Sequence, residues 1–111
     1  MKLTLPFPPS INKMYKVARK RLILSDEGRL YKRTVAAICK KLKVRPMKGH
    51  LKIYVDAYRP RKRGDLDNLF KCLFDSMNRL CYADDSQIVE IHARRFDDKA
   101  RPRVEVEIKN V

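Results

Sequence analysis

The fold is decided by two adjacent stretches, residues 51–58, which read LKIYVDAY, and residues 66–80, which read LDNLFKCLFDSMNRL. In the first, apolar residues alternate with polar or amphipathic ones, which is the period of a half-buried β-strand. In the second, apolar residues recur at intervals of three and four, which is the period of an amphipathic helix. A strand followed by such a helix predicts that the helix packs on the sheet that contains the strand.

The N-terminal half predicts a strand, a loop, a short strand and a helix. Residues 2–7 alternate and predict a strand, which prolines 8 and 9 end because proline cannot donate a hydrogen bond to a sheet. Residues 10–21 predict a basic loop, and residues 21–24 a short strand. Residues 25–42 predict a helix, with the serine at position 25 as its N-cap. Acids in the first turn and lysines in the last turn favour the helix further, because they complement its dipole.

The C-terminal part predicts two more strands. Residues 89–94 and 104–108 both alternate and are separated by a turn, so they predict a β-hairpin. The whole order predicts an α+β fold, a mixed β-sheet with two main helices packed on it. The length of 111 residues predicts a single domain over residues 1–111.

Composition restricts the classes of protein. No apolar stretch approaches the roughly 18 residues that span a membrane, and no apolar signal block follows the start, so we expect a cytoplasmic protein with no membrane partner. Cys39, Cys72 and Cys81 are odd in number and lack a Cys-x-x-Cys spacing, so we expect reduced, buried thiols rather than disulfides or zinc ligands.

Charge is distributed unevenly along the chain. The net charge is +14, but residues 1–64 hold 19 Lys and Arg against 3 Asp and Glu, whereas residues 65–111 hold 8 against 10. The basic half favours a nucleic-acid partner, since cations that neutralise phosphates release counterions. The acids of the other half need a separate explanation.

Four of these acids flank the predicted helix, Asp65 and Asp67 at its start and Asp84 and Asp85 after its end. Each pair has an ordinary explanation, as a helix cap with a first-turn acid and as a turn before a strand. At 100° per residue Lys71 shares a helix face with Asp67, which is also the spacing of an ordinary surface ion pair.

The two pairs have a further meaning if they come together. They can meet if the strand after Asp85 pairs beside the strand that precedes the helix, and converging carboxylates repel unless a cation lies between them. Oxygen ligands suit Mg²⁺, with Mn²⁺ as a substitute. Acids that hold metals inside a basic protein are what a metal-dependent nuclease needs.

Two other classes of function compete with this one. A non-catalytic nucleic-acid-binding protein, such as a phage repressor or an RNA-binding module, explains the basic half equally well but not the acids. A metal-independent ribonuclease toxin usually relies on His, Arg or Glu, and the chain has only His50 and His92.

Four segments resemble the RusA family of Holliday junction resolvases. Residues 65–71 read DLDNLFK and residues 84–88 read DDSQI, which are similar to the two acidic motifs of that family. Residues 8–12 read PPSIN and residues 25–31 read SDEGRLY, which resemble its N-terminal loop and first-helix entrance. The resemblance extends over most of the chain.

The resemblance implies a homodimeric, Mg²⁺-dependent endonuclease that binds four-way junction DNA and nicks two strands symmetrically. Carried over by position, it implies that Asp65, Asp67 and Asp85 bind the metal and that Lys71 is catalytic, with Asn68 and Asp84 in support. The basic residues that we expect to contact DNA phosphates are Lys13, Lys16, Arg19, Arg61, Lys62 and Arg63.

Overall fold

The computed structural model describes residues 1–60 and 68–111. Its main sheet has the strand order β1-β6-β4-β5, formed by β1 (Lys2–Pro6), β6 (Arg103–Asn110), β4 (Leu51–Arg59) and β5 (Ile88–Asp97). Only the β4–β5 pair is parallel, so the sheet is mixed. The predicted α+β fold is confirmed.

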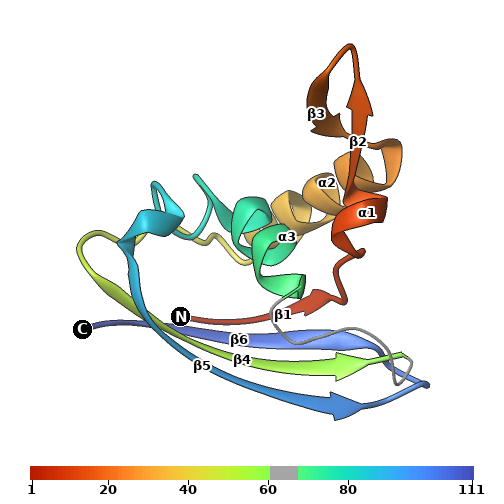
Figure 1. The fold of residues 1–111 in the computed structure, drawn as a ribbon. Coiled ribbons are helices and arrows are strands. Elements are labelled where there is room, and N and C mark those ends of the chain that lie inside the picture. The colour runs from red at the N-terminus through yellow and green to blue at the C-terminus, as the bar shows by residue number, and fades with distance from the viewer. Residues whose placement is uncertain (61–67) are drawn as a thin grey trace.

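Two main helices, α2 (Asp26–Lys41) and α3 (Asn68–Met77), lie on one face of this sheet, and the other face carries no helix in the described residues (Figure 1). A second, two-stranded sheet projects from the body beside α2. None of the helices in residues 1–60 and 68–111 has the length and apolar character needed to cross a membrane.

The core lies between the helices and the inner face of the sheet. The alternation of β4 is reproduced by its burial, since the apolar residues at positions 51, 53, 55 and 57 are buried while the residues between them are half-buried. All three cysteines are free and buried within this core, as expected, and burial raises their pKa values, that of Cys81 to about 12. The thiols therefore pack as small apolar groups.

The predicted C-terminal hairpin is wrong. β5 and β6 do not pair with each other, because β4 lies between them and pairs with both. The inner face of β6 presents buried Val104, Val106 and Ile108. The corresponding positions of β5 are Ile91, Ala93 and Arg95, of which only Ala93 is partly buried. The more apolar strand takes the interior position, because burial there removes more apolar surface from water.

The predicted loop over residues 10–21 is also replaced by structure. It contains a one-turn helix, α1 (Ile11–Met14), and β2 (Tyr15–Ala18), which pairs with β3 (Arg21–Leu24) as an antiparallel hairpin. Its two turn residues, Arg19 and Lys20, both have positive φ, the geometry of a tight hairpin turn that usually favours Asn-Gly. Because that Asn-Gly signal is absent, the hairpin could not be expected from the sequence.

The helix predicted to reach Leu80 stops earlier, at Met77. Arg79 has φ 67°, and the backbone amide of Arg79 donates to the Tyr82 carbonyl at 2.7 Å. The apolar period alone did not reveal this stop, because Leu80 still packs against the core after the chain has turned.

Gly28 permits the close packing of the hairpin base on α2. Ser25 caps the helix as predicted, accepting from the Gly28 amide at 3.0 Å, and its own amide donates to the Met14 carbonyl at 2.9 Å. A Cβ at position 28 would lie 2.3 Å from that same Met14 carbonyl oxygen. No side chain fits this position unless backbone moves.

We predict that Gly28→Ala lowers the free energy of unfolding by about 1–3 kcal/mol, as overpacking typically does. Helix propensity alone predicts the opposite sign, since Ala is better than Gly by about 1 kcal/mol. Urea unfolding measures the difference, with exposed Arg29→Ala as the control in the same helix. A Gly28→Ala protein as stable as the wild type would contradict the close approach.

Candidate active site

The helix α3 presents Lys71 at the surface, with half of its side chain exposed. Asn68, one turn earlier, is the first described residue of the helix and is exposed. The expected metal ligands Asp65 and Asp67 lie outside the described residues, as does the expected DNA-binding run 61–63. Of the first motif, residues 65–71, the structure therefore describes only residues 68–71.

Lys71 is held by two side chains that the sequence analysis did not select. Its Nζ lies 3.3 Å from Oδ2 of Asp75, one helical turn later, and 5.3 Å from the ring centroid of Tyr15. The Tyr15 hydroxyl donates to the same Asp75 oxygen at 2.5 Å. Burial, and then the hydrogen bond to Asp75, raise the pKa of Tyr15, so that its hydroxyl remains a donor.

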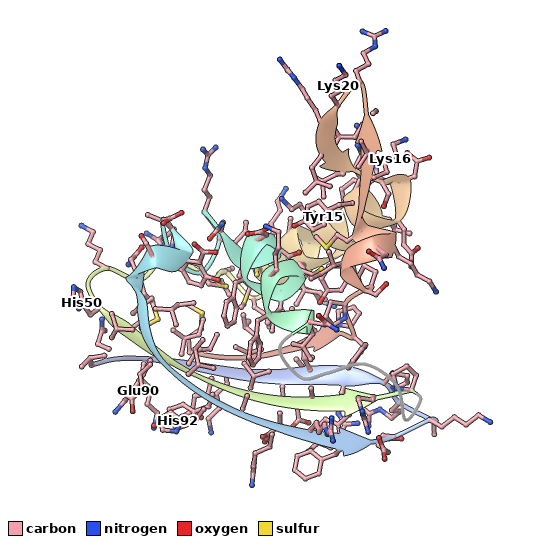
Figure 2. The ribbon with its side chains drawn as sticks, in the orientation of Figure 1. Tyr15, Lys16, Lys20, His50, Glu90 and His92 are labelled. Carbon is pink, nitrogen blue, oxygen red and sulfur yellow. The ribbon has the colours of Figure 1, made fainter. Side chains whose placement is uncertain are left out.

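Asp75 carried a weak sequence signal, since it lies four residues after Lys71 on a helix. Tyr15 carried none, because it is 60 residues away and its strand was not expected. Tyr15 is the first residue of β2, so it joins the base of the hairpin to α3 (Figure 2).

The second motif forms a short 3-10 turn, η1 (Asp85–Gln87), directly before β5. Asp84 caps it by accepting from the Ser86 amide at 3.0 Å. Hydrogen bonding from the Ser86 side chain, and then from its amide, lowers the pKa of Asp84. At pH values above the ordinary pKa of Asp, the Asp84 carboxylate therefore stabilises the turn. This contribution to stability is lost as the pH falls through the lowered pKa of Asp84.

Gln87 fixes the same turn to the body. Its amide oxygen accepts from the backbone amides of Ala83 and Asp84, and its amide nitrogen donates to the carbonyls of Met47 and Gly49, all at 2.9–3.1 Å. The Asp85 carboxylate makes no hydrogen bond or ion pair with the described residues. The turn thus uses Asp84 and Gln87 for structure and leaves Asp85 available.

The two motifs are connected through α3. β5 pairs beside β4 as the hypothesis of convergence required, but the pairing is parallel, so Ile88 is level with Leu51 and the end of β4 at Arg59 is level with Asp97. Asp85, which precedes β5, therefore lies at the opposite end of the sheet from Arg59, the last residue of β4. The chain returns between these ends through α3, as parallel strands require a crossover.

Tyr82 shows that the turn and the later half of α3 are neighbours. The Tyr82 hydroxyl donates to the Phe74 carbonyl at 2.9 Å. Burial chiefly raises the pKa of Tyr82, and the nearby negative charges of Asp85 and Asp75 raise it further. Asp85 and Asp75 thus both lie within electrostatic reach of the Tyr82 hydroxyl.

In the described residues no three His, Cys, Asp or Glu side chains cluster as a metal site. The expected set requires Asp65 and Asp67, so residues 68–111 supply one of its three carboxylates, Asp85. One further oxygen is notable, since Asn78 Oδ1 is buried without a hydrogen-bond partner just after α3. Unpaired oxygens of this kind suit a hard cation rather than zinc.

The expected basic residues that are described lie on the projecting N-terminal segment. Lys13 belongs to α1, Lys16 to β2 and Arg19 to the hairpin turn, and all three are exposed. Lys16 and Lys20 extend from the hairpin in Figure 2, with Lys20 near its tip. The hairpin therefore holds these positive charges close together on one projecting element.

We predict that Gln87→Ala lowers the free energy of unfolding by about 1–3 kcal/mol, because four backbone groups lose a hydrogen-bond partner, the half-buried Met47 carbonyl among them. Asp85→Ala should leave stability within about 0.5 kcal/mol of the wild type, since the Asp85 carboxylate makes no hydrogen bond or ion pair with a described residue. Urea unfolding of both variants tests the division of roles. Equal destabilisation by the two substitutions would mean that Asp85 is structural.

Comparison with known proteins gives a consistent result. The family model described as endodeoxyribonuclease RusA matches residues 6–109. The proteins named crossover junction endodeoxyribonuclease RusA from Escherichia coli strain K12 and from Enterobacteria phage 82 are each 35% identical over 109 residues, which is 96% of this chain and 91% of theirs. The relative of that name from Enterobacteria phage HK97 is 35% identical over 96 residues, 85% of this chain and 74% of its own. With a match over nearly its whole length, this chain belongs to the RusA family of endodeoxyribonucleases.

Proposed function

We propose that this protein is a Mg²⁺-dependent endonuclease that resolves four-way DNA junctions by paired symmetric nicks. The observation that carries the proposal is the family match, which includes both acidic motifs and whose curated relatives are named crossover junction endodeoxyribonucleases. The alternative of a non-catalytic binder does not account for motifs shared with nucleases.

The charge of the surface supports a DNA substrate. A net charge of +14 on 111 residues attracts a polyanion at long range, and the exposed cations of α1 and the hairpin are placed to contact phosphates. The basic run 61–63 directly precedes Asp65, so we propose that it contacts the phosphates beside the scissile one.

We propose that Asp65, Asp67 and Asp85 hold one or two Mg²⁺ ions. Asp85 fits this role because its carboxylate is free of described partners while Asp84 beside it is committed to the cap. Bound Mg²⁺ would supply Lewis-acid activation of water and stabilisation of the leaving 3′ oxygen. Hydrolysis then leaves 5′-phosphate and 3′-hydroxyl ends, which can be ligated.

Lys71 supports the chemistry by its charge. Its ammonium is half exposed and paired with Asp75, and we propose that it stabilises the negative charge that develops on the phosphate. The pairing with Asp75 orients the side chain while substrate is absent. Asn68, three residues before Lys71, would support the carboxylates from the start of α3.

Symmetric cutting requires two active sites, and we propose that a homodimer supplies them. A junction is close to two-fold symmetric, so a two-fold dimer places one site on each of two equivalent strands. The second cut is then intramolecular and fast at high effective concentration. Two surfaces this basic repel, so the interface must use apolar strand or helix faces.

We predict that Asp67→Asn abolishes cleavage of a labelled four-way junction in Mg²⁺ and that EDTA does the same to the wild type. Binding in Ca²⁺ should remain intact or become tighter, because a negative charge facing phosphates has been removed. Asp26→Asn, an exposed acid at the start of α2, is the matched control and should cut normally. Near wild-type cutting by Asp67→Asn would refute the metal site.

We predict that light scattering gives a mass near twice 13.1 kDa at micromolar concentration without DNA. A supercoiled plasmid with an extruded cruciform should then become mostly linear at early times. A monomeric mass with nicked circles accumulating first would contradict the dimer, while leaving the metal site unaffected.

A further inference from the structure

The hairpin of β2 and β3 projects from the body beyond α2 (Figure 1). Its register places Val17 opposite Leu22 and Tyr15 opposite Leu24, so these four side chains share one face. At the base of the hairpin Tyr15 and Leu24 pack against the core. Towards the tip, Val17 and Leu22 are 76% and 61% exposed, so the outer part of the apolar face is uncovered.

The rim of the same hairpin is basic. Residues 11–25 contain five cations and no acid, and Lys16, Arg19, Lys20 and Arg21 are all exposed on the hairpin. No ion pair forms at these four cations within the described residues. This charge favours a nucleic acid over a second copy of a protein with net charge +14.

A surface that is both apolar and basic fits one feature of branched DNA. In an intact duplex every base is stacked, and an apolar side chain that enters must first unstack a step, which is costly. At the branch point of an open junction the terminal base pairs already expose an unstacked face, with phosphates close on either side. An apolar pair on a two-stranded ribbon, narrow enough to enter a groove, can cover that face without the cost.

We propose that the β2–β3 hairpin inserts the Val17–Leu22 pair against the unstacked base pairs at the branch point, with its cations on the flanking phosphates. This proposal rests on the proposed function, and adds to it the residues that select a junction over a duplex. The base of the hairpin is tied to α3 through Tyr15 and Asp75, beside Lys71. Seating the hairpin therefore fixes which phosphates come near Lys71.

The test compares Val17→Thr combined with Leu22→Thr against the wild type, because threonine keeps the preference for a strand while removing apolar surface. Affinity in Ca²⁺ is measured for a four-way junction and for a duplex of the same sequence. The double variant should lose about fivefold or more in affinity for the junction and little for the duplex. Leu42→Thr with Val111→Thr, equally exposed elsewhere, is the matched control and should change neither affinity.

A second readout reports on the branch point itself. The fluorescence of 2-aminopurine placed there should change when the wild type binds, and this change should be lost with the threonine variant. Replacing the turn, Arg19→Asn with Lys20→Gly, suits positive φ better and so preserves the hairpin. It should weaken binding to junction and duplex alike, and reduce the salt slope by roughly 0.9 for each lost phosphate contact.

The outcomes separate this proposal from the one it rests on. A wild type without preference for the junction would refute the proposed function and the hairpin role with it. A wild type with that preference, unchanged in the threonine variant, would refute the hairpin role alone. A threonine variant that becomes monomeric but keeps its selectivity would show that the apolar pair contacts a second copy instead.

Discussion

The double pairing of β4 is the constraint on which the rest of the structure depends. β4 accepts β6 antiparallel on one side and β5 parallel on the other. Because parallel strands cannot be joined by a tight turn, the chain must cross over, and α3 is that crossover. The parallel pair therefore determines where α3 begins and ends, and with it where Lys71 and the Asp84–Asp85 turn lie.

The candidate site combines a rigid part and an available part. Rigidity comes from neutral or paired groups, namely the Gln87 amide with its four backbone partners and the Tyr15–Asp75–Lys71 network. The available group is Asp85, whose carboxylate makes no hydrogen bond or ion pair with a described residue. A site that must bind a cation and a phosphate benefits from this division, because its ligands are positioned without being neutralised.

The helices and strands that the sequence predicted correctly are those with a local signal, such as an apolar period or a cap. The alternation in β4 and the serine cap of α2 are local signals, and both elements formed within a residue or two of the expected bounds. The pairing of strands is not local, so the expected C-terminal hairpin was wrong. A correct prediction would have required comparing the two strands as candidates for the interior position of the sheet. One strand carries Arg95, and the other carries Val104, Val106 and Ile108.

The candidate site was predicted in the same uneven way. The sequence pointed to Lys71 and to the Asp84–Asp85 turn from motif spacing, and the metal roles of Asp65, Asp67 and Asp85 stay predictions. It could not point to Tyr15, because that contact needs a hairpin whose turn residues, Arg19 and Lys20, lack the usual Asn-Gly signature. Residues that act through contacts between distant parts of the chain can be identified only when the fold is known.

We propose that carboxylates from both ends of α3 form one metal site, and Mn²⁺ binding to the DNA-free protein measures whether they do. Electron paramagnetic resonance of free Mn²⁺ gives the affinity without depending on cleavage. The account predicts that Asp65→Asn and Asp85→Asn each weaken Mn²⁺ binding by about tenfold or more, as loss of a shared ligand should. Wild-type Mn²⁺ affinity in Asp85→Asn, with a loss in Asp65→Asn only, would contradict a shared site.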